Sequence, residues 1–402
     1  MVDTVRMTKP LQGLKVIELG TLIAGPFAAR ILAEFGAEVI KIESPDGGDP
    51  LRQWRKIYQG TSLWWYVQAR NKKSVTVNLK HPDGCEIVKR LVTEADLVIE
   101  NFRPGVLEKL ALGWDVLSAL NPGLVMVRLS GFGQTGPMAS QPGFGAIGES
   151  MGGLRYVTGF PDRPPVKTGV SIGDSIAALW GVAGALMALR HRDANGGMGQ
   201  VVDVALYEAV FAMMESLVPE YDMFGFIRER TGNIMPGITP SNTHTTRDGR
   251  HIIVGANGDA IFKRLMNAIG RTDLAENPSL ATNSGRDAQR DEIYAVIEAW
   301  VGAHDSEHVL KVLHEAEVPV SRIYSVADML EDPQFLARQI IETVRLKGGK
   351  QLKIPGIVPK LSDTPGGTEW VGPELGEHNE EVLGKLGYTS EAIARLRREG
   401  AI

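Results

Sequence analysis

Short apolar runs alternate with segments of helical spacing through the first half of the chain, and this alternation limits the possible folds more than any other feature. Short apolar runs are typical of buried strands, and helical connections between them favour parallel neighbours. We therefore predict an α/β fold, in which a mostly parallel sheet is covered by helices on both faces. The expected strands are Lys15–Leu19, Glu38–Glu43, Ser74–Leu79, Asp96–Glu100 and Leu124–Leu129.

The carboxyl ends of the expected strands indicate where a ligand binds, because sheets of this kind bind ligands beyond that edge. The first of these ends reads G-T-L-I-A-G-P at 20–26 and lacks the G-x-G-x-x-G pattern of dinucleotide-binding turns. Glu43 ends the second strand, where a ribose-binding acid would stand, but by itself it does not indicate an NAD-dependent enzyme. The helix opened by Gly25 and Pro26 can still hold a phosphate on its free N–H groups.

A long apolar stretch and an irregular segment indicate how the second half of the chain is divided into helices, a linker and a further domain. Helices are expected at Asp174–His191 and Val202–Leu217, and Phe224–Thr243 has the irregular composition of a linker. A strand and two helices are expected after it. The predicted parts are residues 1–200, the first part of a large domain; 201–225, a linker helix; 226–322, a small α/β domain; and 323–402, a return linker with the C-terminal part of the large domain.

Composition and charge exclude several classes of protein. The net charge of −5 does not suit nucleic-acid binding, which needs a basic face. Cys85 is the one cysteine of the sequence, so an internal disulfide is impossible and a reducing cytoplasm is expected. Met1–Pro10 has no apolar h-region of a signal peptide, and the apolar stretch Ile176–Leu189 is short for a bilayer span. We therefore expect a cytoplasmic protein that binds neither nucleic acid nor membrane.

The residues H-D-S-E-H at 304–308 match a known zinc-binding pattern, H-x-x-E-H. Asp305 or Ser306 is expected to cap a helix, which leaves His304 before that helix. His304 and His308 would then not share a face, so we predict that the chain binds no metal there.

Asp174 stands at the start of a long expected helix, between Gly173 and Ser175. An aspartate in this position is commonly the N-cap of the helix. It is also suited to act as a nucleophile, because the preceding glycine leaves the carboxylate open to a ligand and the helix N-terminus favours its negative charge. The residues alone leave both interpretations open.

Several cations and one amide lie next to the third and fourth expected strands. Asn71, Lys72 and Lys80 bracket the third strand, and Arg103 and Lys109 follow the fourth. Each of them, taken singly, suits a solvated surface position. Together, near one edge of a sheet, they suit the phosphates of a ligand such as coenzyme A (CoA), through charge-assisted hydrogen bonds.

A series of motifs in fixed order resembles the class III CoA-transferases, the family that contains formyl-CoA transferase and crotonobetainyl-CoA:carnitine CoA-transferase. The resemblance runs from about Leu11 to the C-terminus, and its strength comes from the order of the motifs rather than from any one of them. They are L-x-G-L-K-V-I-E-L at 11–19, A-G-P at 24–26, G-A-E-V-I-K-I-E at 36–43, N-K-K-S at 71–74, E-N-F-R-P-G at 100–105, S-G-F-G-Q-T-G-P at 130–137, G-D-S at 173–175, G-x-G-Q at 197–200 and L-G-E-H at 375–378.

The resemblance implies that Asp174 is the nucleophile. In the family, this carboxylate attacks an acyl-CoA thioester to form an anhydride, and CoA then passes through an aspartyl thioester to the acceptor acid. These exchanges need neither metal nor ATP, because each step trades one activated acyl group for another, and CoA is the one cofactor implied. The implied CoA-contacting positions are Thr21, Leu22, Ile23, Ala24, Lys80, Asn101 and Lys109, with Arg103 as a neighbour.

Departures from formyl-CoA transferase argue against formate and oxalate as substrates. Ile23 replaces a glutamine, Ser44 replaces an arginine, and residues 234–242 lack the glycine run of a covering loop. Phe144 replaces a tyrosine or histidine, and Glu149 is a candidate to serve at the substrate site instead. The chain more closely resembles members that use succinyl-CoA and dicarboxylic acids. The cations that suit a second acceptor carboxylate are Arg52, Arg70 and Arg103.

The resemblance also implies a large Rossmann-like domain built from both chain ends, a smaller α/β domain, and an interlocked, ring-like homodimer. Two rival functions share the implied fold or ligand. An α-methylacyl-CoA racemase needs two bases, and Phe144 occupies the place of its histidine. A non-catalytic CoA-binding protein would not need Asp174, which this chain retains.

Overall fold

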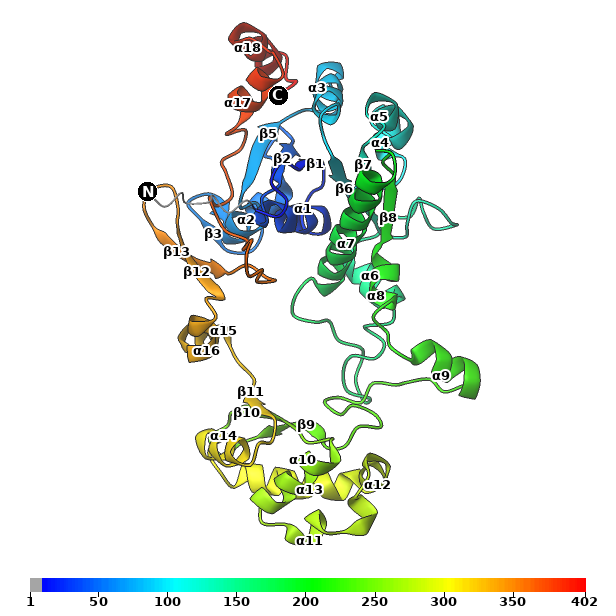
Figure 1. Cartoon of the computed structure of the whole chain (residues 1–402), viewed down its shortest axis with the longest axis vertical. Coiled ribbons are helices and arrows are strands. Elements are labelled where there is room, and N and C mark those ends of the chain that lie inside the picture. The colour runs from blue at the N-terminus through cyan, green and yellow to red at the C-terminus, as the bar shows by residue number, and fades with distance from the viewer. Residues whose placement is uncertain (1–8) are drawn as a thin grey trace. The chain divides into compact units, whose positions relative to one another are not determined.

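The computed structural model describes residues 9–402 (Figure 1). The first eight residues lie outside it, and with them most of Met1–Pro10, where no signal peptide is predicted. The chain forms two compact units, which we call the sheet unit and the second unit. The sheet unit comprises Met1–Leu154, Thr168–Asp222 and Gln339–Ile402, and the second unit comprises Arg155–Lys167 and Met223–Arg338. The second unit thus includes the predicted small domain, 226–322, and extends beyond both of its bounds.

A six-stranded, fully parallel sheet forms the centre of the sheet unit, in the order β5-β2-β1-β6-β7-β8. Val16 of β1 is paired with Val39 on one side and with Leu97 on the other. The predicted α/β class and parallel sheet are therefore confirmed. The strands are β1 (Lys15–Glu18), β2 (Glu38–Glu43), β5 (Lys72–Thr76), β6 (Leu97–Glu100), β7 (Val125–Ser130) and β8 (Val201–Ala205).

Two of the sequence predictions for this sheet are wrong. Residues 201–205 form the edge strand β8, not the start of a helix over Val202–Leu217, and two short helices follow instead. The residues V-V-D-V-A are rich in β-branched side chains, which favour a strand when a partner such as β7 is available. The third predicted strand, Ser74–Leu79, begins earlier, because Lys72 and Lys73 already pair with β2.

Helices cover both faces of the sheet, and alternate strand residues divide between two apolar cores. Val16 points into the core beneath α1 and α7, whereas Ile17 points into the core beneath α3 and the C-terminal helices. Alanines on α1 and α7 let these two helices approach each other closely. The helices of this unit are α1 (Ala24–Glu34), η1 (Pro50–Gln53), α2 (Leu63–Gln68), α3 (Pro82–Val92), α4 (Val106–Lys109), α5 (Trp114–Leu120), α6 (Gly145–Met151), α7 (Ile172–Ala194), α8 (Leu206–Phe211), α9 (Leu217–Phe224, across the unit boundary), α17 (Asn379–Lys385) and α18 (Ser390–Arg398).

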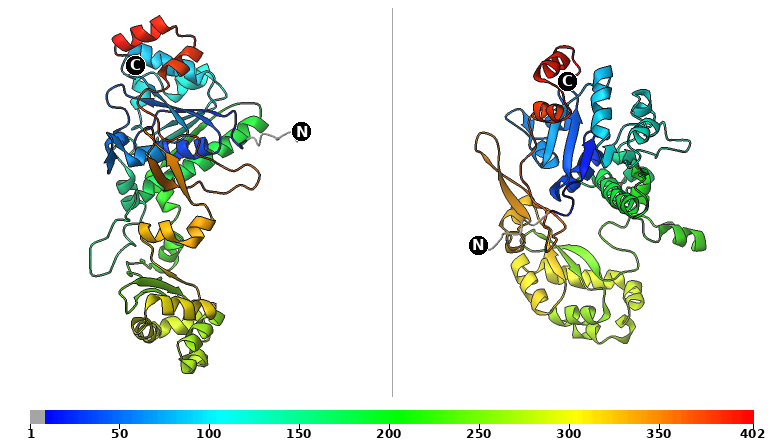
Figure 2. Two further views of the ribbon diagram at one scale, coloured as in Figure 1. Left: turned by 90° about the vertical axis from the view of Figure 1, so that its left-hand side faces the viewer. Right: turned by 45° about the horizontal axis from the view of Figure 1, so that its top comes forward.

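Both ends of the chain build the sheet unit, as predicted. The red C-terminal helices α17 and α18 lie beside the cyan α3 in both views of Figure 2. Upstream of them, a C-terminal segment covers the outer edge of β5: Trp370 Nε1 donates to Lys72 O at 2.9 Å, and Ser74 N donates to His378 Nδ1 at 3.2 Å. The N-K-K-S and L-G-E-H motifs, far apart in the sequence, therefore lie side by side. The short hairpins of this unit are β3–β4 (Ile57–Tyr58, Thr61–Ser62) and β12–β13 (Ile341–Arg345, Gln351–Pro355).

Helix α7 is long and apolar enough to cross a membrane by length and composition, with a mean hydropathy of 1.6 and 44% of its most apolar window buried. It extends beyond the apolar stretch Ile176–Leu189 at both ends. Gly181 of this helix packs on Val127 and Leu129 of β7, which is the position of a core helix in an α/β unit. Core helices pass the same test, so this result is weak evidence for a membrane span.

The second unit packs helices against a three-stranded antiparallel sheet in the order β11-β10-β9. The fully buried Arg286 joins its loops, since Nε donates to Thr239 O at 3.0 Å and Nη2 to Asn257 O at 2.6 Å. Its elements are β9 (Ser241–Thr245), β10 (His251–Gly255), β11 (Val320–Arg322), α10 (Asp259–Ala268), α11 (Thr272–Ala275), η2 (Pro278–Leu280), α12 (Asn283–Ala288), α13 (Arg290–Gly302), α14 (Ser306–Glu315), α15 (Val326–Glu331) and α16 (Pro333–Ala337).

The two histidines of the H-x-x-E-H pattern lie in this unit. Helix α14 begins at Ser306 with Asp305 as N-cap, so His304 does precede it. The rings of His304 and His308 nevertheless stack, with centroids 4.7 Å apart, and the argument that they share no face is wrong. Within residues 9–402, no group of three or more His, Cys, Asp or Glu is arranged to hold a metal ion.

Candidate active site

Asp174 lies at the carboxyl edge of the sheet, as the direction of α7 shows. Near the end of this helix, Arg192 Nη1 bonds Asp96 Oδ1 at 2.9 Å and Gly123 O at 3.3 Å. Those two residues precede β6 and β7, so the end of α7 lies at the amino edge of the sheet. The start of α7, with Asp174, lies at the opposite edge, where the turn after β1 also lies.

Asp174 is in the first turn of α7 rather than at its N-cap. The helix begins at Ile172, and Ser171 is the N-cap residue. The N-cap interpretation of Asp174 is therefore wrong. A carboxylate in the first turn of a helix of 23 residues is still favoured electrostatically, because the helix dipole places partial positive charge there.

A glycine of α6 forms the surface on which the Asp174 carboxylate rests. A Cβ atom on Gly145 would lie 2.0 Å from Asp174 Oδ2, so only the absence of a side chain allows this contact. Gly148 and Gly152 let the same helix pack on α8, where added Cβ atoms would lie 2.8 Å from Leu206 Cβ and 2.7 Å from Tyr207 O. The glycines recur at helical spacing along one face of α6, a signal in the sequence that our motif analysis did not use.

Two further candidate residues flank Gly145. Phe144 is the N-cap residue of α6 and is 65% exposed. Glu149 is 1% exposed, and its Oε1 lies 3.4 Å from Gly173 N. The structure therefore brings both residues to the segment that carries Asp174. Glu149 approaches it from the protein interior, whereas Phe144 faces solvent.

Side chains from neighbouring loops hold the turn after β1. The Asn101 side chain accepts a hydrogen bond from Thr21 N at 2.8 Å and donates one to Thr21 O at 2.9 Å. The Asp49 carboxylate accepts from Leu22 N at 3.1 and 3.2 Å, and Gln68 Nε2 donates to the carbonyl of the next residue at 3.1 Å. Asn101 thus supports the turn, so the two predicted CoA-contacting regions, 21–24 and 101, lie together.

A buried ionic network lies beneath this turn. Lys41 Nζ is 2.8 Å from Glu18 Oε1, from Asp49 Oδ2 and from Gly20 O. Lys72 Nζ is 2.6 Å from Glu18 Oε2 and donates to Pro26 O at 2.7 Å. Burial lowers the pKa of Lys72 to about 8, with the positive charge of Lys41 acting in the same direction. Burial opposes the charge of Lys41 as well, but the Asp49 and Glu18 carboxylates outweigh it and raise the pKa of Lys41.

Four residues predicted to bind ligand are buried and bonded to the protein instead. Lys72 is fully buried at the amino end of β5, so it supports the β1 turn from inside. The Asn71 side chain accepts from Glu369 N at 2.7 Å and donates to Gly367 O. Arg52 pairs with Glu43 at 2.8 Å and stacks over Trp65, and Arg70 pairs with Glu34 at 2.6 Å. A buried cation needs a paired carboxylate, and Lys72, Arg52 and Arg70 each have one within the protein. The Asn71 amide is likewise hydrogen-bonded to the backbone.

The other predicted cations are exposed. Lys80 follows β5, and Lys109 ends the short helix α4. Arg103 Nη2 donates to Ser140 O at 2.9 Å and so links the loop after β6 to the loop after β7. These three residues remain available at the carboxyl ends of their strands.

Charged residues within the strands are the part of the site that the sequence analysis missed. Arg128 of β7 bonds Glu100 at 2.7 Å and Glu108 at 2.8 Å, and Glu100 Oε2 accepts from Phe102 N. Burial raises the pKa of Glu100 despite this pairing. A signal was present, because Glu18, Lys41, Glu100 and Arg128 each interrupt an apolar strand near its carboxyl end.

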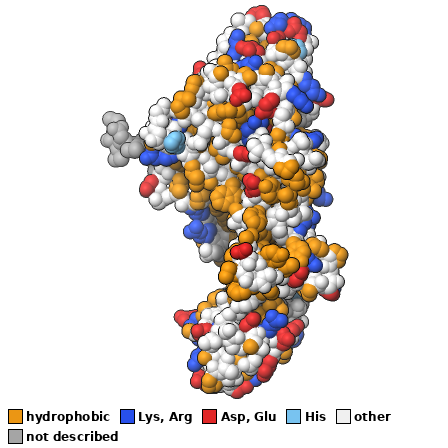
Figure 3. Space-filling view, turned by 90° about the vertical axis from the view of Figure 1, so that its right-hand side faces the viewer, with side chains coloured by type: hydrophobic (Ala, Val, Ile, Leu, Met, Phe, Trp, Pro, Cys, Tyr) orange, Lys and Arg blue, Asp and Glu red, His pale blue; other side chains and the backbone are white. Residues whose placement is uncertain are grey.

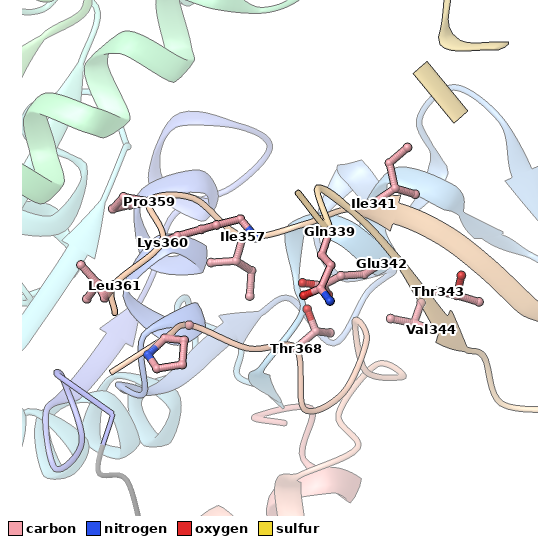
Figure 4. A pocket seen from close by; sticks show the side chains of 12 residues that line it. Gln339, Ile341, Glu342, Thr343, Val344, Ile357, Pro359, Lys360, Leu361 and Thr368 are labelled. Carbon is pink, nitrogen blue, oxygen red and sulfur yellow. The ribbon is translucent and has the colours of Figure 1, made fainter. Parts of the chain in front are cut away.

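A cavity of about 600 Å³ in the sheet unit lies between the β12–β13 hairpin and residues 357–368 (Figure 4). Side chains such as Gln339, Glu342 and Thr368 point toward it. None of the residues that we predicted for the site lines this cavity.

Comparisons with known proteins agree over nearly the whole chain. The profile of CoA-transferase family III matches residues 11–379. A succinyl-CoA–D-citramalate CoA-transferase of Chloroflexus aurantiacus is 51% identical over 399 residues, which cover 99% of either chain. The α subunit of succinyl-CoA–L-malate CoA-transferase of Chloroflexus aurantiacus is 42% identical, over 96% of this chain and 91% of that one. The crystal structure of a CAIB/BAIF family protein from Brucella suis is similar with a TM-score of 0.83 and 35% identity, over 94% of this chain and 100% of that one.

Proposed function

This chain belongs to CoA-transferase family III and is a CoA-transferase, and we propose that it moves CoA from succinyl-CoA to a small dicarboxylic acid through a covalent intermediate on Asp174. The observation that carries the proposal is the placement of the Asp174 carboxylate. It lies in the first turn of α7, at the ligand-binding edge of the sheet, against a glycine that leaves room beside it.

The proposed reaction is a series of acyl exchanges at one carboxylate. Asp174 attacks the thioester carbonyl of succinyl-CoA, the C–S bond breaks, and an anhydride and CoA thiolate form. The thiolate then attacks the aspartyl carbonyl and releases succinate, which leaves an aspartyl-CoA thioester. A carboxylate of the acceptor displaces the thiolate to form a second anhydride. The thiolate finally attacks the acceptor's carbonyl, which yields the new acyl-CoA and restores Asp174.

We assign CoA to the carboxyl edge of the sheet. The turn 21–24 offers backbone groups at the start of α1, which suit a phosphate or a thioester oxygen. The exposed cations Lys80 and Lys109 follow β5 and β6 at the same edge and suit the charged phosphates of CoA.

The proposed donor and acceptor rest on the relatives. The two named enzymes act, by their names, on succinyl-CoA with D-citramalate or L-malate, which are both dicarboxylic acids. Of the three arginines considered for a second carboxylate, Arg52 and Arg70 are buried in ion pairs, whereas Arg103 is exposed. Arg103 is therefore our candidate for the distal acceptor carboxylate.

We also propose that the chain forms a homodimer. Apolar side chains are exposed along α7, including Trp180 at 44% and Met187 at 68%. Both line an apolar groove beside the edge strand β8, on the side of the sheet unit that Figure 3 faces. Apolar patches of this kind commonly mark interfaces between proteins. Light scattering after size exclusion tests the dimer, and a monomeric mass at working concentration would refute it.

Trapping of the intermediate tests the reaction itself. After brief incubation with succinyl-CoA, hydroxylamine or borohydride should modify the peptide that contains Asp174, as read by intact-protein mass spectrometry and peptide mapping. Asp174→Asn should form no adduct, and its kcat should fall by at least about 1,000-fold, because no nucleophile remains. CoA should still bind to this variant. Turnover by Asp174→Asn would refute the mechanism. Exchange of an α-proton in deuterated water without an adduct would favour a racemase, and neither result would favour a binding role.

A further inference from the structure

The turn between β1 and α1 is held at almost every residue by side chains from elsewhere in the sheet unit. Loops at binding sites commonly have few such contacts, whereas this turn is hydrogen-bonded from Gly20 to Pro26. The holding groups are mostly buried, with exposures of 0% for Lys72, 1% for Lys41 and 2% for both Asp49 and Gln68. The contacts are Lys41 to Gly20 O, Asn101 to both backbone groups of Thr21, Asp49 to Leu22 N, Gln68 to Ile23 O and Lys72 to Pro26 O.

Leu22, at the centre of this turn, has an unfavourable backbone conformation. Its φ is 63°, in the left-handed region, which is sterically unfavourable for a residue with a Cβ atom. Such a conformation persists only where the surroundings impose it, and it occurs most often at functional sites. The structure therefore needs a group that keeps Leu22 in place.

Asp49 is that group. Both of its carboxylate oxygens accept from Leu22 N, at 3.1 and 3.2 Å. Its own position is fixed, because it pairs with Lys41 at 2.8 Å and accepts from Leu51 N at 2.9 Å. Burial opposes its negative charge, but Lys41 outweighs that effect and holds the pKa of Asp49 below its usual value. Leu22 N–H is thus bonded to an ionised acceptor that cannot move away.

We propose that Asp49 is a positioning residue that holds Leu22 in the left-handed conformation and so presets the β1–α1 turn for the acyl-CoA. This inference rests on the proposed function. With Leu22 held in this way, the chain turns directly into α1, and Ile23, the N-cap residue, adds no side-chain acceptor for the first N–H groups of the helix. Preorganisation of this kind strengthens binding, because the turn need not be ordered when the ligand arrives.

A purely structural role for Asp49, as the counter-ion of Lys41, predicts a different result, and Leu22→Gly separates the two. Glycine adopts a φ of 63° without the penalty that leucine bears, so it can still take up this conformation when Asp49 is removed. If Asp49 acts through Leu22, Leu22→Gly should rescue Asp49→Ala. If Asp49 only balances the charge of Lys41, Leu22→Gly should make no difference.

The experiment measures KM for succinyl-CoA, kcat and thermal stability of the full-length enzyme. We expect Asp49→Ala to raise KM about tenfold with a smaller change in kcat, and the double variant Asp49→Ala/Leu22→Gly to recover most of that loss. Tm should stay low in both variants, since Lys41 has lost its ion pair with residue 49 in each of them. Should Asp49→Ala not fold, Asp49→Asn with and without Leu22→Gly gives the same comparison, with a smaller rise in KM to be rescued.

Glu34→Gln is the matched control. Glu34 is also 2% exposed and pairs with a buried arginine, Arg70, at 2.6 Å, but its carboxylate makes no hydrogen bond to the described residues 20–26 of the turn. We expect it to lower Tm and to leave KM unchanged. An unchanged KM in Asp49→Ala, or a double variant as weak as the single one, would overturn the inference while the proposed function stands. A wild-type enzyme that transfers no CoA would refute the proposed function, and this inference with it.

Discussion

The two parts of the candidate active site, the β1–α1 turn and the contact between α6 and Asp174 of α7, are shaped by opposite means. The β1–α1 turn is held by charged and polar side chains that reach it from five other elements or loops. The Asp174 carboxylate is placed by the absence of a side chain, since it rests on the Cα atom of Gly145. The conformation of the hydrogen-bonded turn depends on the charges of its partners and therefore on pH. The position of a carboxylate that rests on a glycine depends on the volume of the residue beneath it. The comparison teaches that, at one edge of a sheet, a proposed ligand-binding turn and a proposed nucleophile can be positioned by independent means.

Gly145→Ala should have the largest effect among the changes that test this comparison. The new methyl group would lie 2.0 Å from Asp174 Oδ2 and must displace the carboxylate. We expect kcat to fall about 100-fold, because a displacement near 1 Å is enough for such a loss, and KM for acyl-CoA to change little. The measurement is steady-state kinetics of CoA transfer.

Gly384→Ala is the control for that change. Gly384 lies within α17, and among the described residues a Cβ atom there would meet no heavy atom within 4 Å other than its chain neighbours and the backbone of its own helix. We expect unchanged kcat and an equal or slightly higher Tm, because alanine is favoured over glycine within a helix. Wild-type kcat in Gly145→Ala would show that volume does not place Asp174.

Asn101→Ala should have a smaller effect, and on binding rather than on the chemical step. The variant loses two hydrogen bonds to Thr21, so we expect KM for acyl-CoA to rise about five- to tenfold with kcat nearly unchanged. Asn121→Ala is the control, because the Asn121 side chain also bonds the backbone, donating to Val92 O and Ala95 O and accepting from Gly123 N, but precedes β7 at the amino edge. Equal KM values for the two variants would contradict the supporting role of Asn101.

The pH dependence of stability should reveal the charges beneath the turn. The pKa of Lys72 is lowered from 10.5 to about 8 in the folded protein, so the unfolded chain binds more protons between these two values. Stability must therefore rise with pH across that window, by up to about 3 kcal/mol from this group. Urea unfolding at pH 7.5 and 9.5 should show the gain in the wild type relative to Lys72→Met. A parallel change in both proteins would contradict the lowered pKa of the buried Lys72.

Much of the fold follows from local sequence pattern. Buried parallel strands are apolar along their length, so β1, β2, β6 and β7 can be recognised without a structure. β8 could not, because V-V-D-V-A follows a long helix and a glycine-rich turn and continues into further helical residues. The partner strand β7 decides its conformation, and that partner is far away in the sequence.

The candidate site divides in the same way. Asp174 can be found from the G-D-S motif and its place at a helix start. Its contact with Gly145 cannot, since it depends on how α6 packs on α7. Lys72 and Arg70 are positively charged, as residues that bind an anionic ligand commonly are. The structure shows instead that they are buried in ion pairs with Glu18 and Glu34.

The sequence by itself determined the class of fold, the family and the candidate nucleophile Asp174, because these depend on local pattern and on ordered motifs. The tertiary structure alone decided which charges stay exposed and which are buried in ion pairs. A charge and its partner, such as Lys41 and Asp49, come from different strands and loops. The cost of burying an ion is met only when folding brings that partner within hydrogen-bond distance, and no local pattern encodes such a meeting.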